Sequence, residues 1–165
     1  PFREFKSHVH EGGIATPMIA HWPAGIDATL NGGWNKDVGH VIDIMATCVD
    51  LAEATYPVKH KGLVITPMEG ISLKPAFTGH PIEREGMLFW EHQGNRAVRD
   101  GDWKLVAKGI NGPWELYNLL PDRTESNNLA KTHPDRVKQL IKAWDAWAQR
   151  AKVYPLPTYG AWKKK

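Results

Sequence analysis

Four short segments rich in apolar and aromatic residues, in which the period changes to two, constrain the fold more than any other feature of the sequence. They are residues 87–91, 96–99, 103–107 and 114–118. A period of two is typical of a strand with one buried face. Asp100-Gly101, between the second and third segments, is the strongest hairpin signal in the chain. The pattern therefore predicts a four-stranded antiparallel meander with one face available for a helix.

A helix that suits this face follows the strands. Residues 132–135, Thr-His-Pro-Asp, form a helix start signal with a proline in the first turn. Apolar residues then recur at helical spacing, namely Val137, Leu140, Ile141, Trp144, Trp147, Ala148 and Ala151. We predict a small sheet-plus-helix domain over residues 81–153, followed by an extended basic tail over residues 154–165.

The first half of the chain carries weaker patterns. Residues 18–20 are apolar and lie between two prolines, which predicts a short strand because proline is tolerated at strand ends. Residues 40–54 have apolar side chains at helical spacing and predict a mostly buried helix, with Asp43 as its N-cap and Cys48 packed on the buried stripe. The predicted fold class is α+β.

The composition limits the classes of partner that this chain is expected to bind. The net charge is only +3, three lysines lie in the terminal tail, and no basic stripe typical of a nucleic-acid-binding surface is present. No apolar run reaches the length of a membrane span, and no signal peptide is evident. Cys48 is the only cysteine, so an intrachain disulfide is excluded. We expect neither a nucleic-acid partner nor a membrane span.

A polar loop precedes residues 18–20. It contains Lys6, His8, His10 and the run Glu11-Gly12-Gly13, whose glycines permit a sharp turn. Loops held by a scaffold often carry functional side chains. The two histidines and the glutamate raise the hypothesis of a zinc site, but two imidazoles without a third ligand support it weakly. Histidines at a pocket mouth and plain surface histidines are the alternatives.

Taken together, these segments resemble the formylglycine-dependent sulfatases (arylsulfatases) of the alkaline-phosphatase superfamily. The matching positions are Lys6, Glu11-Gly12-Gly13, Pro17, Trp22-Pro23 and residues 41–47, 68–73, 88–106 and 114–119. The resemblance implies the C-terminal portion of an alkaline-phosphatase-like α/β sulfatase fold, with residues 1–80 as the end of its catalytic domain. It covers nearly the whole chain but only about the C-terminal third of a sulfatase, so we expect a fragment.

The resemblance implies roles for five residues. Lys6 matches the lysine that contacts the sulfate oxygens, where a cation stabilises the charge that develops as the ester bond breaks. A solvated surface lysine is the alternative. His8, His10, His92 and Asn95 would bind substrate near the pocket mouth. For His92 and Asn95 the alternative is an exposed hairpin turn.

The resemblance also implies a catalytic centre outside this sequence. The formylglycine nucleophile of the family arises from a Cys or Ser in a Cys-x-Pro-x-Arg-like signature, and residues 48–52 have neither the proline nor the arginine. The Ca²⁺ ligands are expected upstream of Lys6. We therefore expect this chain to be inactive alone and to require the remainder of the catalytic domain as its partner.

The complete protein would then act on a sulfated small molecule or glycan, in the periplasm or as a secreted protein. Two alternatives stay open from the residues. One is a phosphate-ester or phosphonate hydrolase of the same superfamily, which the upstream nucleophile would distinguish. The other is a non-catalytic binding module.

Overall fold

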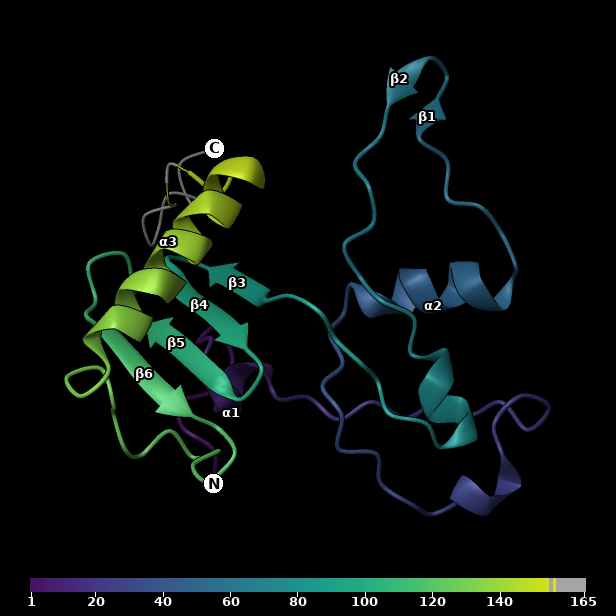
Figure 1. Cartoon of the computed structure of the whole chain (residues 1–165), viewed down its shortest axis with the longest axis horizontal. Coiled ribbons are helices and arrows are strands. Elements are labelled where there is room, and N and C mark those ends of the chain that lie inside the picture. The colour runs from purple at the N-terminus through teal and green to yellow at the C-terminus, as the bar shows by residue number, and fades with distance from the viewer. Residues whose placement is uncertain (155, 157–165) are drawn as a thin grey trace. The chain divides into compact units, whose positions relative to one another are not determined.

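The computed structural model describes residues 1–154 and 156, which form two compact units (Figure 1). One unit contains residues 1–17 and the described residues from 86 onward, and the other contains residues 18–85. The sequence analysis placed residues 1–17 with the catalytic domain, whereas here they belong to the unit that contains the sheet. Most of the predicted tail, residues 155 and 157–165, lies outside the described residues.

The sheet has the predicted topology. Its strands are β3 (Leu88–His92), β4 (Asn95–Asp100), β5 (Trp103–Ala107) and β6 (Trp114–Asn118), hydrogen-bonded in that order and all antiparallel. The turn between β3 and β4 consists of Gln93 and Gly94, with φ of 53° and 83°. Two consecutive positive φ values are what a two-residue type I′ hairpin turn requires. The α+β fold class is confirmed.

The predicted helix covers one face of this sheet. Helix α3 (Pro134–Arg150) buries Leu140, Trp144 and Ala148 against residues of β4, β5 and β6, namely Val98, Leu105 and Leu116. Trp144 also donates a hydrogen bond from Nε1 to the carbonyl of Trp90, at 3.1 Å. Burial of each large apolar side chain contributes about 2 kcal/mol, so this face anchors the unit.

The N-terminal segment covers the opposite face. Val9 is buried there with residues of three successive elements, namely Ala97, Val106, Tyr117 and Leu119. Ile14, at the end of the short helix α1 (Glu11–Ile14), packs against the same cluster. The sheet is therefore a central layer with α3 on one side and residues 1–17 on the other. The sequence analysis expected only the first of these two layers.

The second unit has short elements joined by long connections (Figure 1). In chain order they are η1 (Ala28–Leu30), α2 (Asp43–Leu51), β1 (Lys59–His60), β2 (Leu63–Val64) and η2 (Lys74–Thr78). The predicted strand at residues 18–20 is wrong for this structure, because no described strand pairs with these residues and Ile19 is 94% exposed. A strand needs a neighbour to receive its backbone hydrogen bonds.

Helix α2 is present but does not match the predicted burial. Its buried residues are Asp43, Ala46 and Thr47, whereas Ile44 and Met45 on its apolar stripe are exposed. Cys48 is exposed as well, so the expectation of a packed thiol is wrong here.

The predicted N-cap role of Asp43 is also wrong. Its carboxylate accepts hydrogen bonds from the backbone amides of His40 (2.7 Å) and Ile71 (3.0 Å) and pairs with Arg84. Asp43 therefore ties three segments of this unit together. Across the described part of the chain, no helix has the length and apolar character needed to cross a membrane.

Candidate functional site

Lys6 lies at the tip of a tight turn. The amide of His8 donates to the carbonyl of Phe5 at 3.1 Å, and Lys6 has a φ of 46°, in the left-handed region. This backbone conformation is unfavourable for a residue with a Cβ, so the surroundings must hold it. The Lys6 side chain is exposed, and within the described residues its ammonium forms no ion pair. The turn of residues 5–8, called the Lys6 turn below, thus presents an available cation.

Asn95 joins the Lys6 turn to the sheet. Its Nδ2 donates to the carbonyls of Ser7 and His92, both at 3.0 Å, and its Oδ1 accepts from the amide of Gly109 at 2.9 Å. The residue is only 7% exposed. Its polar atoms are therefore used within the chain rather than open to a ligand. His92, whose side chain is exposed, begins the hairpin turn that Asn95 ends.

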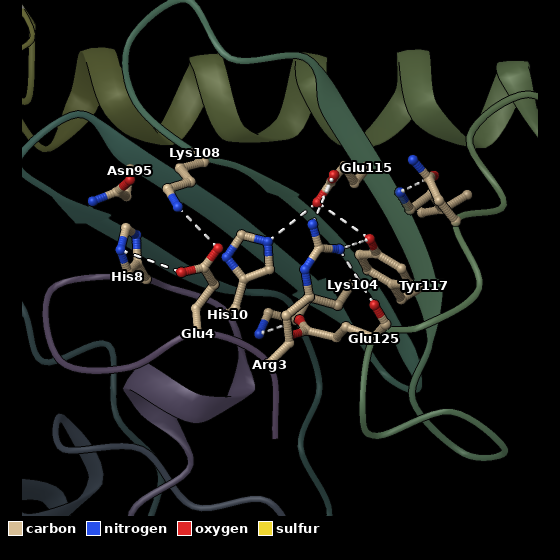
Figure 2. Close-up of polar contacts among 12 residues, drawn as sticks. Arg3, Glu4, His8, His10, Asn95, Lys104, Lys108, Glu115, Tyr117 and Glu125 are labelled. Carbon is tan, nitrogen blue, oxygen red and sulfur yellow. Dashed lines mark hydrogen bonds and ion pairs between the residues drawn. The ribbon is translucent and has the colours of Figure 1, made fainter. Parts of the chain in front are cut away.

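Glu4 connects the other side of the Lys6 turn to the sheet unit. Its carboxylate lies 3.4 Å from Nε2 of His8 and 3.0 Å from Nζ of Lys108 (Figure 2). The hydrogen bond from Lys108 is the main cause that lowers the pKa of Glu4. His8 also contacts Phe5 edge-on, with ring centroids 5.8 Å apart. The Nε2 atom of the His8 ring is thus engaged by Glu4, which precedes the turn.

His10 points into the protein and not toward solvent. It is 1% exposed, and its Nε2 lies 3.2 Å from a carboxylate oxygen of Glu115 (Figure 2). Burial lowers the pKa of His10 and outweighs the opposing effect of Glu115, so the ring is neutral near pH 7 and donates from Nε2. In this structure His10 anchors the N-terminal segment, and a direct substrate contact does not fit its burial.

Glu115 is the centre of a larger polar cluster. It accepts hydrogen bonds from Arg3 at 3.1 Å and from the hydroxyl of Tyr117 at 3.2 Å. Burial acts to raise the pKa of Glu115, but the hydrogen bonds from His10 and Arg3 outweigh it and the pKa is lowered. Burial raises the pKa of Tyr117, which therefore remains a neutral phenol. The cluster connects β6 to two residues of the N-terminal segment.

A fully buried lysine forms a second connection. Nζ of Lys104 lies 2.9 Å from carboxylate oxygens of both Glu11 and Glu125, and Glu125 in turn accepts a hydrogen bond from the amide of Glu11 at 2.8 Å. Lys104 and Glu125 are almost completely buried, and Glu11 is 3% exposed. Arg123 approaches the other oxygen of Glu11 at 3.5 Å. The glutamate of the Glu-Gly-Gly run therefore holds α1 against β5.

The two glycines of that run allow the chain to fold back on itself. The amide of Gly12 donates to the carbonyl of Arg3 at 2.8 Å, and a Cβ at Gly12 would meet the carbonyl oxygens of Arg3 and Glu4. A Cβ at Gly13 would meet the carbonyl oxygen of His8. Close backbone approach explains both glycines. The run thus shapes the segment that carries Lys6.

The structure brings Lys6, His8, His92 and Asn95 to the end of the sheet at the β3–β4 hairpin, whereas His10 lies elsewhere, and both Asn95 and His10 are buried. Lys6 and His8 lie in the Lys6 turn, and Asn95 connects that turn to the hairpin that begins with His92. His10 lies against Glu115. Lys104 and Glu125 were missed by sequence reasoning. One signal for Lys104 was present, because Lys104 and Val106 alternate with residues that face α3 and so must share the opposite face.

No residue of this chain is assigned to a metal ion. Among the described residues, no group of three or more His, Cys, Asp or Glu side chains is arranged to hold one. His8 and His10 are engaged by Glu4 and Glu115, so the zinc hypothesis finds no third ligand beside them. The residues present do not fit the Ca²⁺ site that the family resemblance implies.

Curated proteins that are similar to this chain are named as sulfatases. An uncharacterized sulfatase of Schizosaccharomyces pombe is 33% identical over 163 residues, which cover 95% of this chain and 29% of that protein. A sulfatase of Formosa agariphila is 26% identical, with 99% and 34% covered. N-acetylgalactosamine-6-sulfatase of Canis lupus familiaris is 25% identical over 130 residues, which cover 79% of this chain and 23% of that protein. The chain thus spans about a third or less of the curated relatives that it matches.

Solved structures show the same fold. The crystal structure of Ps i-CgsB in complex with k-i-k-neocarrahexaose has a TM-score of 0.70 and 24% identity, and covers 90% of this chain and 32% of that one. A protein solved in work on glycosaminoglycan metabolism by Bacteroides thetaiotaomicron has a TM-score of 0.68 and 20% identity, with 90% and 32% covered. At this identity the likeness supports the fold alone. No protein-family model matches the chain.

Proposed function

We propose that this chain, whose curated relatives are named as sulfatases, is the C-terminal part of an enzyme that hydrolyses sulfate esters. The observation that carries this proposal is the geometry of Lys6. Its ammonium is exposed and forms no ion pair among the described residues, while the backbone around it is held on both sides. Because the backbone that carries Lys6 is held, less reorganisation is needed when its ammonium binds an anion.

Lys6 would act on the sulfate group. Cleavage of a sulfate ester moves negative charge onto the leaving oxygen and the sulfate oxygens. An ammonium directed at these atoms stabilises the transition state more than the ground state, which is the requirement for catalysis. Lys6 is the one residue of this chain that we assign to the reaction itself.

The nucleophile and the metal belong to residues outside this chain. We propose a formylglycine nucleophile and a Ca²⁺ ion there, because no described side chains of this chain fit a metal site. The remainder of the catalytic domain is accordingly the proposed partner of this chain, which should be inactive alone. The proposed location of the complete protein is the periplasm or the cell exterior.

A sulfated glycan is the proposed substrate class. One curated relative is named N-acetylgalactosamine-6-sulfatase, and a protein of similar fold was crystallised in complex with k-i-k-neocarrahexaose. The position of His92 favours an extended substrate. Its side chain is exposed, and it begins the β3–β4 hairpin turn, which Asn95 connects to the Lys6 turn. We propose that His92, with His8, contacts the part of the glycan remote from the sulfate.

The test is a Lys6→Ala substitution in the complete protein. The matched control is Lys138→Ala, which removes an exposed lysine of α3 whose partner, Asp135, is also exposed. Hydrolysis of an aryl sulfate and of an aryl phosphate should be measured for each variant. The expected result is a parent protein that prefers the sulfate, with sulfate hydrolysis strongly lowered in Lys6→Ala and retained in Lys138→Ala. A preference for the phosphate would instead support the superfamily alternative.

A further inference from the structure

The Lys6 turn has few internal contacts that could hold it in place. Its own closing bond is the one from the His8 amide to the Phe5 carbonyl, at 3.1 Å. Lys6 adopts a left-handed backbone conformation that a side chain with a Cβ disfavours. Phe5 is largely exposed and adds little buried surface. The orientation of Lys6 therefore depends on contacts from outside the turn.

Asn95 provides such a contact next to the lysine. It donates from Nδ2 to the carbonyl of Ser7, the residue that follows Lys6, at 3.0 Å. The same nitrogen donates to the His92 carbonyl, and Oδ1 accepts from Gly109. With both ends of its amide engaged and 7% of the residue exposed, Asn95 has a fixed orientation. It begins β4, and its backbone pairs with His92 of β3.

We propose that Asn95 is a positioning residue for the sulfatase reaction, acting on Lys6 through the Ser7 carbonyl. This proposal rests on the proposed function of Lys6. It replaces the expectation that Asn95 contacts substrate, because its amide has no free donor or acceptor directed away from the chain. Small displacements of an aligned catalytic group are costly, about 10²-fold in rate for 1 Å.

Asn95→Asp in the complete protein tests the contact with a near-isosteric change. Aspartate retains an oxygen to accept from Gly109 but has no amide hydrogens for Ser7 and His92. We expect kcat for an aryl sulfate to fall about 10²-fold, with a much smaller change in KM. Asn128→Asp is the matched control, because Asn128 uses only its Oδ1, as acceptor for the amides of Leu116 and Ala130. This control should retain the parent rate.

A double-mutant cycle separates positioning from substrate contact. If Asn95 acts through Lys6, Asn95→Asp should have almost no further effect on kcat in a Lys6→Ala background. An additive loss in the double variant would show that Asn95 acts independently of Lys6 and would overturn the proposal. Parent rates in Lys6→Ala alone would refute the proposed function, and the catalytic role of Asn95 with it.

Hydrogen exchange supplies a readout that does not depend on turnover. The His8 amide closes the Lys6 turn, so it should exchange at least about tenfold faster in Asn95→Asp than in Asn128→Asp. Asn95→Ala removes the same donors without adding a charge and takes the place of Asn95→Asp if that variant does not fold. An unchanged exchange rate at His8 in a folded Asn95 variant would overturn the proposal.

Discussion

The Nζ atom of Lys104 lies 2.9 Å from a carboxylate oxygen of Glu11, and both residues are buried. This pair joins the Glu-Gly-Gly run of the N-terminal segment to the middle of the sheet, and Glu125 completes it from the loop after β6. Two carboxylates thus face one ammonium where solvent is excluded. The acidic residue of the run has a structural role, which is to fix the segment that carries Lys6.

Lys104→Met should strongly destabilise the sheet unit. The substitution preserves much of the side-chain volume but leaves Glu11 and Glu125 buried without their shared cation. Loss of one partner of a buried ion pair costs about 3–5 kcal/mol. Urea unfolding followed by tryptophan fluorescence is a suitable measurement, because Trp144 is buried in this unit.

The control for this substitution is Lys138→Met. Lys138 pairs with Asp135 at 3.3 Å on an exposed helix surface, where such pairs contribute little. Combining Lys104→Met with Glu11→Gln and Glu125→Gln should recover part of the lost stability, since no unpaired charge then remains buried. Equal effects of Lys104→Met and Lys138→Met would show that the buried group does not stabilise this unit.

His10 should make stability depend on pH below about 6.5. Burial lowers the pKa of the folded His10 from its ordinary value of 6.5, so the unfolded chain binds a proton at pH values where the folded chain does not. The contribution of the neutral ring to the unfolding free energy is fully present above pH 6.5. It is lost as the pH falls from 6.5 through the lowered pKa of the folded His10. His10→Gln should therefore show a shallower loss of unfolding free energy between pH 7 and about pH 5 than the parent.

His21→Gln serves as the comparison for His10, because His21 is exposed. His40 titrates in the same direction, since burial lowers its pKa, and it is present in all three proteins. The difference between the two variants isolates His10. Identical pH profiles for His10→Gln and the parent would contradict the buried neutral imidazole.

The sheet and α3 were predictable because their signals are local. The strand pattern of β3–β6 and the helical stripe from Val137 onward each involve residues close together in the sequence. The two-residue turn Gly101-Asp102, next to the predicted Asp100-Gly101 signal, sets the pairing of β4 with β5. The docking of the N-terminal segment was not predictable in this way. Glu11 meets Lys104 across 93 positions and Glu125 across 114, and no periodicity reports contacts at that separation.

Burial in the second unit was mispredicted for a related reason. The spacing of Ile44, Cys48 and Leu51 establishes that α2 has an apolar stripe, but it carries no information on what covers the stripe. Among the site residues, the polar loop that carries Lys6 and the turn between the strands at His92 were predicted from the sequence, whereas the tight turn at Lys6 was not. The anchoring roles of His10 and Asn95 required their partners, Glu115 and Ser7, to be seen.

The chain as a separate polypeptide should associate or bind a hydrophobic dye. Large apolar side chains of residues 18–85 are exposed, among them Ile19, Trp34, Val41, Ile44 and Val64. Exposure of several large apolar side chains in one unit favours association and dye binding. Replacing Ile44 and Met45 by lysine should reduce dye binding without loss of helix. A monodisperse monomer that unfolds cooperatively and binds no dye would contradict this expectation.

His92→Ala should have an effect that depends on the substrate. If His92 contacts the remote part of a sulfated glycan, its loss should lower kcat/KM for that glycan and leave a minimal aryl sulfate nearly unaffected. Steady-state kinetics on both substrates in the complete protein provide the measurement. His60→Ala, at an exposed position of β1, is the matched control. Equal losses on the two substrates would remove His92 from the glycan-binding role.

The most direct test of the account is the value of kcat/KM for an aryl sulfate in the complete protein with and without Lys6. A cation directed at charge that develops in the transition state contributes about 10²–10³-fold in rate. Lys6→Ala should therefore lower kcat/KM by about that factor on any sulfate ester, at an unchanged melting temperature, because the exposed side chain makes no described contact. Parent rates in Lys6→Ala, with Lys138→Ala equally active, would contradict the assignment of Lys6 to the reaction.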